Sequence, residues 1–256
     1  FDVYDANNIN PLYGFFVARA GLGASESMRS KLAEYNDPRL SRAFITKQGA
    51  SGKEQAPGTA DNAVYAPNGS PEQGTSKYGT SLFMYSISAP TLLLSYHELK
   101  FLEAEALCRL GRDAKSALKD AVVAGLLNAE NSFSVSRKEL GKTLINPASS
   151  ITDTEAESYF DNTIEAKYTA EPLKTTMIQK YFALWGASGE ATESYNDVRR
   201  MKGLGENFIE LKNPNSFPLR CPYGNSDTTT NAEVKAAYGN GQYVYSENVW
   251  WAGGSR

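Results

Sequence analysis

Residues 89–130 read APTLLLSYHELKFLEAEALCRLGRDAKSALKDAVVAGLLNAE, and this stretch decides the fold class. In its first half, apolar side chains recur every three or four residues, which is the period of one helix face. Those side chains are Leu92, Tyr96, Leu99, Leu102, Ala106 and Leu110. Gly111 predicts the end of this helix, because glycine readily adopts the left-handed conformation that closes a helix. A second helical run follows, with an apolar side of Ala117, Leu118, Ala121, Val122 and Leu126.

Two helices joined by a tight turn predict an antiparallel hairpin. The small residues Ala104 and Ala117 stand where the helices must approach closely, and Leu107 and Ala124 fall in the same seam. This layout resembles a tetratricopeptide hairpin with one extra residue in the turn, although an ordinary helix pair has similar spacing. Since one repeat cannot bury its own face, we expect stacking partners elsewhere in the protein.

The segment before the hairpin is rich in turn-forming residues. It predicts a short helix from Ser25 to Tyr35, which the Asn-Asp-Pro sequence at 36–38 ends, and a short strand within SLFMYSIS at 81–88. A loop of roughly forty residues, 46–89, is longer than the connections of compact domains, and such loops are usually functional or disordered.

The tyrosines of this loop are the candidate ligand-binding residues. Tyr65 and Tyr78 offer flat aromatic faces, while Asn68 and Lys77 supply directed hydrogen bonds among neighbouring glycines and serines. The alternative interpretation is a loop that is disordered or that contacts the barrel of a partner protein.

Further helices are expected after the hairpin. The pattern predicts helices at Asp153–Lys167, Glu171–Trp185 and Glu193–Met201, and Pro172 suits a helix start because its missing N–H is not needed there. The predicted fold class is therefore all-α with long loops and minor short strands.

The stretch 178–200, IQKYFALWGASGEATESYNDVRR, places acids and arginines together, as a reaction centre would. Glu193, Asp197 and Arg200 are spaced three or four residues apart on a predicted helix, where they satisfy one another's charges. The single His97 lies inside a helical run, and we interpret it as a partly buried polar residue. None of the common catalytic or phosphate-binding motifs occurs, so no enzyme and no cofactor are expected.

Composition excludes other classes of function. The 26 basic and 29 acidic residues give a net charge of −3, and no basic block could neutralise a run of phosphates, so no nucleic-acid partner is expected. Cys108 and Cys221 do not form a metal-ligand spacing with His97, so no metal site is expected. The 15 tyrosines beside abundant Gly, Ser and Asn suit a surface that binds by stacking and adaptable hydrogen bonds.

Four segments resemble the SusD/RagB family of outer-membrane nutrient-binding lipoproteins of the Bacteroidetes, in its SusD-like 2 branch. They are NPLYGFF (10–16) with YNDPRL (35–40), LLSYHELKFLEAEALCRLG (93–111), the stretch 178–200, and FPLRCPY (217–223) with NVWW (248–251). The markers follow the family's order over nearly the whole chain.

The resemblance implies a stack of tetratricopeptide-type hairpins under a loop-rich face. Residues 1–256 would be the C-terminal part of a single SusD-like domain, with a loop-rich segment at 1–90, the hairpin at 91–130, and helices with C-terminal loops at 131–256. The lipid anchor would lie outside this segment. Family ligand contacts come from variable loops, whereas the motif residues would be scaffold: Gln179, Lys180, Glu193, Asn196, Asp197, Arg199 and Arg200.

The implied function is capture of an oligosaccharide or peptide at the cell surface and delivery to a SusC-like, TonB-dependent transporter of the outer membrane. A structural or scaffold surface protein that uses helical repeats for protein partners is the alternative. A glycosidase is a third reading, and it would need two acids projecting into a cleft.

Overall fold

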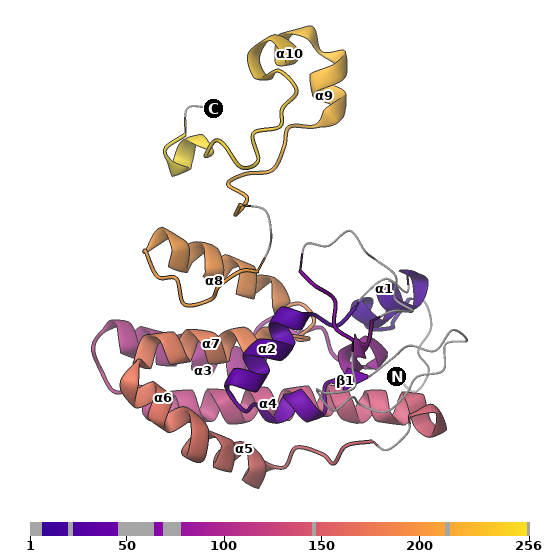
Figure 1. The fold of residues 1–256 in the computed structure, drawn as a ribbon, viewed down its shortest axis with the longest axis vertical. Helices are drawn as coiled ribbons and strands as arrows, with labels where there is room; N and C mark the ends of the chain where they lie inside the picture. The colour runs from indigo at the N-terminus through magenta and orange to yellow at the C-terminus, as the bar shows by residue number, and fades with distance from the viewer. Residues whose placement is uncertain are drawn as a thin grey trace. The chain divides into compact units, whose positions relative to one another are not determined.

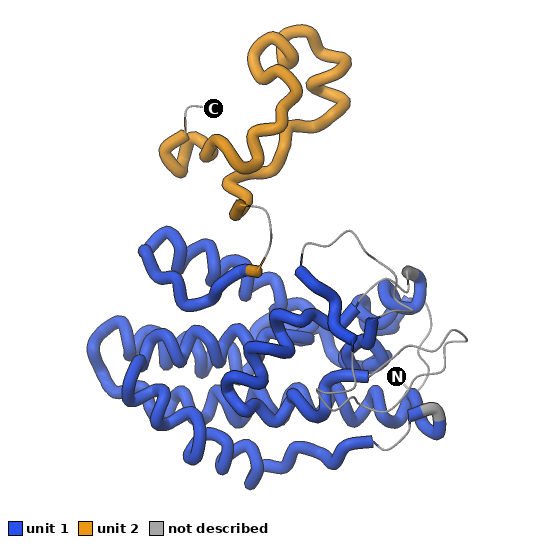
Figure 2. Tube along the Cα trace, viewed as in Figure 1, with its two compact units in different colours: residues 1–211 blue, residues 212–256 orange. Residues whose placement is uncertain are grey.

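The computed structural model describes residues 7–19, 23–45, 64–68, 78–144, 147–212 and 216–254. The chain divides into two compact units, residues 1–211 and residues 212–256 (Figure 2). The described residues are mainly helical, and their one sheet pairs β1 (Phe44–Ile45) antiparallel with β2 (Thr80–Ser81). The all-α fold with minor short strands that the sequence predicts is therefore confirmed.

The central hairpin consists of α3 (Tyr96–Arg109) and the long helix α4 (Lys115–Leu140), which crosses the first unit in Figure 1. Gly111 ends α3 with φ of +66°, and the Arg112 N–H donates to the Leu107 carbonyl at 2.9 Å. Ala104 and Ala117 are both buried, as expected at a close seam. The helix α4 extends beyond residue 130 because apolar residues such as Phe133 continue its buried face.

The apolar face of α3 that the sequence pattern indicates is not the buried face of this helix. Tyr96, Leu99, Leu102 and Leu110 are 58%, 51%, 43% and 67% exposed. The opposite face, which carries His97, Glu98, Phe101, Ala104 and Glu105, is the buried one. Apolar residues occur on both sides of this helix, so their period alone does not say which side faces the core. Glu98 and Glu105 look like surface residues in the sequence because Glu190 and Arg200, which they meet in the fold, lie far along the chain.

A second helical layer packs against this hairpin. It begins with α5 (Asp153–Tyr159), continues through a π-helical turn η4 (Phe160–Ile164) into α6 (Glu165–Ala170), and returns as α7 (Pro172–Leu184). A Cβ atom added at Gly125 of α4 would lie 2.9 Å from the Cβ of Ala183 of α7, so these helices approach closely. The helix α8 (Ala191–Gly203) follows. The three helices expected after the hairpin are confirmed, with small shifts at their ends.

The N-terminal part contains a helix that the sequence analysis missed. Helix α1 (Pro11–Arg19) starts where Asn10 Oδ1 accepts the N–H of Leu12 at 2.9 Å. The expected helix at 25–35 is confirmed as α2 (Glu26–Glu34), and a 3-10 turn η1 (Pro38–Ser41) follows it.

The expected strand at 81–88 is mostly wrong. Only its first residue belongs to β2, and residues 82–85 form the 3-10 helix η2 (Leu82–Tyr85). The turn begins there because Ser81 Oγ accepts the N–H of Phe83 at 3.3 Å, and a side chain that caps in this way favours a turn over a ladder.

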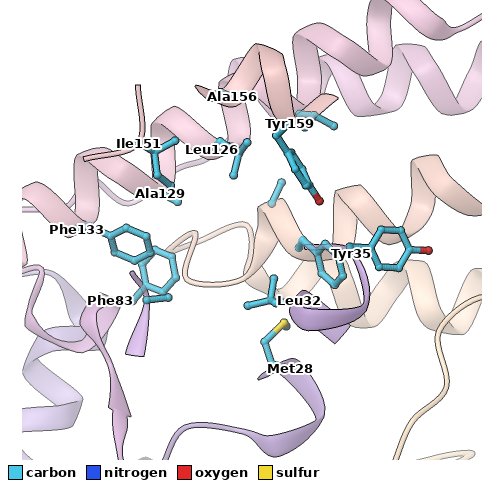
Figure 3. Packing of buried hydrophobic residues seen from close by; sticks show 14 of the residues in the cluster. Met28, Leu32, Tyr35, Phe83, Leu126, Ala129, Phe133, Ile151, Ala156 and Tyr159 are labelled. Atoms are coloured by element: carbon cyan, nitrogen blue, oxygen red, sulfur yellow. The ribbon is translucent and has the colours of Figure 1, made fainter. Parts of the chain in front are cut away.

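One hydrophobic core connects the N-terminal segments to the hairpins. Figure 3 shows Met28 and Leu32 of α2 on one side of this core and Leu126, Ala129 and Phe133 of α4 on another. The rings of Phe83 and Phe133 have centroids 4.7 Å apart. The segment before the hairpin is therefore tied to the helical scaffold through its own apolar residues.

The second unit is small and holds α9 (Asn225–Thr230), α10 (Ala232–Tyr238) and a 3-10 turn η5 (Trp250–Ala252). The rings of Tyr223 and Tyr238 stack with centroids 4.4 Å apart.

Among all the residues with assigned positions, no helix combines the length and apolar character that crossing a membrane requires.

Candidate functional site

The described parts of the tyrosine-rich loop are held beside the start of α2. The Ala66 N–H donates to the Ala24 carbonyl at 2.8 Å, and the Glu26 N–H donates to the Ala66 carbonyl at 3.0 Å. The Gly79 N–H donates to the Val64 carbonyl at 2.8 Å. These backbone bonds fix residues 64–68 against the scaffold, so the candidate side chains there have defined positions.

Tyr65 and Asn68 lie at the same edge of α2. The Tyr65 ring is half-buried, with its centroid 5.2 Å from that of Phe44 at an interplanar angle of 89°, and the Arg29 guanidinium lies 5.7 Å from the same ring's centroid. Asn68 is exposed, and its Oδ1 accepts the hydroxyl of Ser25, the N-cap of α2, at 3.1 Å. The structure therefore brings these two predicted residues together.

The placement of Tyr78 corrects the expectation that it lies on an exposed loop. It is 4% exposed, and a Cβ atom added at Gly23 would come within 3.2 Å of the Tyr78 Cβ. Gly23 packs closely against this side chain, and the buried ring offers little surface to a ligand. Lys77 lies outside the described residues.

A groove that the sequence analysis did not identify runs along the other side of α2. It has a volume of about 330 Å³ and lies between α2, the α6–α7 region and residues 208–210. Lysines, glutamates and aromatic rings line it together with smaller and aliphatic side chains. They include Lys31, Lys167, Lys174, Glu34, Glu171, Tyr35, Tyr181 and Phe208. The sequence gives no sign of this groove, because its walls come from three separate segments.

The charges of the groove are mostly paired with neighbours. Lys174 Nζ lies 2.8 Å from Glu171 Oε2, and Lys31 Nζ donates to the Glu210 carbonyl at 3.1 Å. The Lys167 ammonium lies 4.5 Å from the centroid of the Tyr35 ring, a cation–π distance. Burial, with further contributions from Glu34 and Glu171, raises the pKa of Tyr35 to about 12.

The buried polar residues of α7 and α8 connect helices. Lys180 Nζ lies 2.8 Å from Asp197 Oδ2, and both side chains are largely buried. Gln179 Nε2 donates to the Tyr159 hydroxyl at 3.4 Å. Arg200 Nη2 donates to Asp197 Oδ1 at 2.8 Å. This arrangement supports the scaffold interpretation of these motif residues.

The two arginines that end the motif behave differently. Arg200 Nη2 also donates to Glu105 Oε2 at 2.8 Å, so it ties α8 to α3. These arginine hydrogen bonds hold the pKa of the Glu105 carboxyl below its usual value even though burial acts to raise it. Arg199 is exposed, and its guanidinium lies 5.7 Å from the Tyr195 ring centroid on the same helix. Arg200 bonds across to α3 although its own side chain is 41% exposed, whereas the contact described for Arg199 lies on its own helix, so the scaffold interpretation fits Arg200 better than Arg199.

An acidic pair that the sequence analysis missed lies beneath the start of α3. Glu98 and Glu190 are both buried, and Glu190 accepts the Ser95 N–H. Burial, followed by a hydrogen bond to Glu190, raises the pKa of Glu98 to about 7. His97 Nε2 lies 3.4 Å from Glu190 Oε2 without hydrogen-bond geometry, and burial lowers the pKa of this imidazole. Because these groups are enclosed, they are suited to holding helices rather than to reaching a substrate.

Within the part of the chain that the structure places, no cluster of three or more His, Cys, Asp or Glu side chains could hold a metal ion.

Comparison with solved structures shows strong similarity to a SusD/RagB family protein from Bacteroides thetaiotaomicron, with 66% sequence identity and a TM-score of 0.88. The match covers 100% of this chain and 55% of that protein. A SusD homolog from Bacteroides fragilis has 19% identity and a TM-score of 0.60, with 93% of this chain and 54% of the homolog covered. A Bacteroidetes SusD-like protein has 18% identity and a TM-score of 0.56, with 94% and 55% covered.

The two more distant structures show the shared fold. The chain spans about half the length of each of these three proteins. No curated protein matches the chain. The family model SusD-like 2, described as starch-binding associating with outer membrane, matches residues 3–223. Given this match and the 66% identical SusD/RagB relative, the chain belongs to the SusD-like family.

Proposed function

We propose that this chain is part of a binding protein that captures an oligosaccharide or peptide nutrient at the cell surface and passes it to a SusC-like, TonB-dependent transporter of the outer membrane. Membership of a family described as starch-binding and associated with the outer membrane carries this proposal. The protein would be held at the membrane by a lipid anchor outside these 256 residues. Residues 1–256 would form the C-terminal part of one SusD-like domain.

The proposed ligand surface follows both sides of α2. Tyr65 and Asn68 form one end of it, and Tyr78 is buried nearby. Lys77 is proposed as a ligand contact from the sequence alone. The groove beside Tyr35 forms the other end. Its volume of about 330 Å³ falls at the lower limit of small-molecule sites, so it would hold one sugar ring or one peptide side chain.

The chemistry of this surface suits recognition rather than reaction. Polar ligands such as sugars are bound by directed hydrogen bonds beside apolar ring surfaces, and partly exposed rings are present at Tyr65 and, in the groove, at Tyr181 and Phe208. The buried acids Glu98 and Glu190 lie inside the scaffold, where a glycosidic bond could not reach them. We therefore propose that the protein is not an enzyme.

The proposal is tested by screening oligosaccharides and peptides for binding to this chain and, side by side, to the 66% identical relative. A hit is then titrated calorimetrically against Tyr65→Ala and Lys167→Ala, with Glu157→Ala on α5 as a control away from α2. Loss of a stacking contact should weaken binding by roughly 1–3 kcal/mol, which is about 5- to 150-fold in Kd. The proposed surface is wrong if both substitutions leave Kd unchanged, and the proposed function is wrong if neither protein binds any member of the library.

A second candidate function is a scaffold protein that binds other proteins through its repeats. The exposed apolar side of α3 favours it, because apolar helix faces are usually covered by another helix. In that case the same screen would give no small ligand, and a protein partner would bind at α3.

A further inference from the structure

Three titratable side chains are enclosed together where the start of α3 meets the turn between α7 and α8. His97, Glu98 and Glu190 are 2%, 6% and 2% exposed. His97 Nε2 and Glu190 Oε2 lie 3.4 Å apart, and neither atom has a hydrogen-bond partner among the described residues. Burial first, and then Arg39 of η1, lower the pKa of this imidazole, whereas Glu190 acts to raise it. Since buried polar atoms are normally paired, this group calls for an explanation beyond helix packing.

The two carboxyl groups have no cation to themselves. Glu98 hydrogen-bonds to Glu190, and it is also influenced by Lys180 of α7 and Glu193 of α8, in opposite directions. The Lys180 ammonium is already paired with Asp197 at 2.8 Å. Two adjacent buried carboxyls cannot both ionise without a large cost, so such a pair keeps one proton in mildly acidic solution and loses it as the pH rises.

The same pair fastens the turn between α7 and α8 to the segment before α3. Glu190 accepts the Ser95 N–H, and the Leu92 N–H donates to the Ser188 carbonyl at 2.7 Å. Gly189 has φ of +95°, and the Leu92 carbonyl leaves no room for a Cβ atom there. The turn therefore lies directly against this segment, and a change at Glu190 acts on a closely packed contact.

Packed aromatic rings connect the turn to the proposed ligand surface. The turn directly follows Trp185, which ends α7. The ring centroids of Trp185 and Phe44 are 5.4 Å apart, and those of Phe44 and Tyr65 are 5.2 Å apart. Phe44 is fully buried, and close-packed interiors transmit displacements because they have little free space. A shift of the turn can therefore reach Tyr65 through two ring contacts.

We propose that the Glu98–Glu190 pair is a proton-controlled latch that sets the position of the Trp185 turn and, through Phe44, of the Tyr65 edge of the proposed ligand surface. A proton shared by the two carboxyls holds the turn in place. When that proton passes to the solvent, two negative charges lie side by side and Glu190 moves away from α3 with its turn. The regulatory role rests on the proposed function, whereas the coupling itself is measured without a ligand and so stands or falls separately.

The test follows NMR resonances of the chain between pH 6 and pH 8. Burial, followed by the bond to Glu190, raises the pKa of Glu98 to about 7. We therefore expect the Trp185 indole N–H and the Ala66 amide, which bonds to the Ala24 carbonyl beside Tyr65, to titrate together with a midpoint near pH 7. Both should lose this titration in Glu98→Gln, which keeps the shape of the protonated acid. The Ala156 amide of α5 is the control and should not respond.

Two further variants separate the steps of the latch. Glu190→Gln should move the midpoint to lower pH, because Glu98 then loses its acidic neighbour but stays buried, and this variant keeps the proposal testable if Glu98→Gln does not fold. Trp185→Leu should remove the titration at Ala66 and keep it at the Ser95 N–H, which Glu190 accepts.

Four results overturn the proposal. They are a Trp185 indole that does not titrate, a titration that persists in Glu98→Gln, a midpoint that is unchanged in Glu190→Gln, and an Ala66 amide that stays constant while the indole titrates. The last result would mean that the acid pair acts only on its own turn and does not reach the ligand surface.

Discussion

Replacing Lys180 by methionine should destabilise the first unit strongly. The Lys180 and Asp197 side chains are only 3% and 12% exposed, and their charged atoms are 2.8 Å apart. Removing one member of a buried ion pair leaves the other charge uncompensated, which typically costs about 3–5 kcal/mol. Asp197 keeps Arg200 as a partner, so we expect a value near the lower limit of that range.

Lys174→Met is the matched control for Lys180→Met. Lys174 lies on the same helix and pairs with Glu171 at the same 2.8 Å distance, but these side chains are 38% and 58% exposed. Exposed pairs contribute about 0–1 kcal/mol. In a unit of this size, 1 kcal/mol corresponds to roughly 2–4 °C in Tm, so Lys180→Met should lower Tm by about 6–12 °C and Lys174→Met by no more than about 4 °C.

Thermal melts followed by circular dichroism measure both variants. The double variant Lys180→Met/Asp197→Leu should recover part of the loss, because no buried charge is then left without its partner. The reasoning is refuted if Lys180→Met and Lys174→Met melt within about 2 °C of each other, which would mean that depth of burial does not decide the cost of these pairs.

Three further predictions concern stability. The pKa of Glu98 is raised from 4.5 to about 7, so its stabilising effect is present below pH 4.5 and is lost as the pH rises through 7. Tm of the wild type should therefore fall relative to Glu98→Gln between pH 5 and pH 8, and parallel Tm curves would contradict this. Gly186 has φ of +78° beside an aromatic ring, whereas Gly111 has φ of +66° with no atom near its missing Cβ. In urea unfolding, each of Gly186→Ala and Gly111→Ala should lower the free energy of unfolding by about 1 kcal/mol or more. The loss should be larger for Gly186→Ala, and the reverse order would be inconsistent with the packing. Arg200→Ala should lower Tm several times more than Arg199→Ala in the same melts, and equal losses would show that the bonds from α8 to α3 contribute little.

The helices could be predicted from the sequence because their signals are local. Caps, proline at a helix start and glycine at a helix end all act within a few residues, and they placed α2, α7 and the end of α3 well. Helix α1 has the same kind of signal in Asn10 and Pro11, but the surrounding turn-forming residues obscured it.

The orientation of α3 could not be predicted because it depends on partners far along the chain. Glu105 meets Arg200 of α8, and Glu98 lies beside Glu190, whereas the contact of Glu105 with Arg109 is a local i,i+4 pair. The pairings with Arg200 and Glu190 leave no periodic signal in the sequence, and a buried charge is tolerated only where the fold supplies its partner.

The candidate ligand-binding site could be predicted only in part, because the burial of its side chains also depends on segments far along the chain. Tyr65 and Tyr78 look alike in the sequence, and both follow turn-forming residues. They differ in their neighbours in the fold: Tyr78 packs against Gly23 and is covered, whereas Tyr65 lies against Phe44 and Arg29 and is half-buried. The groove beside Tyr35 has no sequence signal, because three distant segments form it.

The central claim is that this chain carries a surface that binds a nutrient without changing it. The most direct measurement is equilibrium dialysis of an oligosaccharide and peptide library against the chain and its 66% identical relative, with mass spectrometry of the bound fraction. We expect saturable retention of one ligand class, which is recovered chemically intact and is retained less by Tyr65→Ala. Recovery of cleaved ligand, or no retention by either protein, would contradict it.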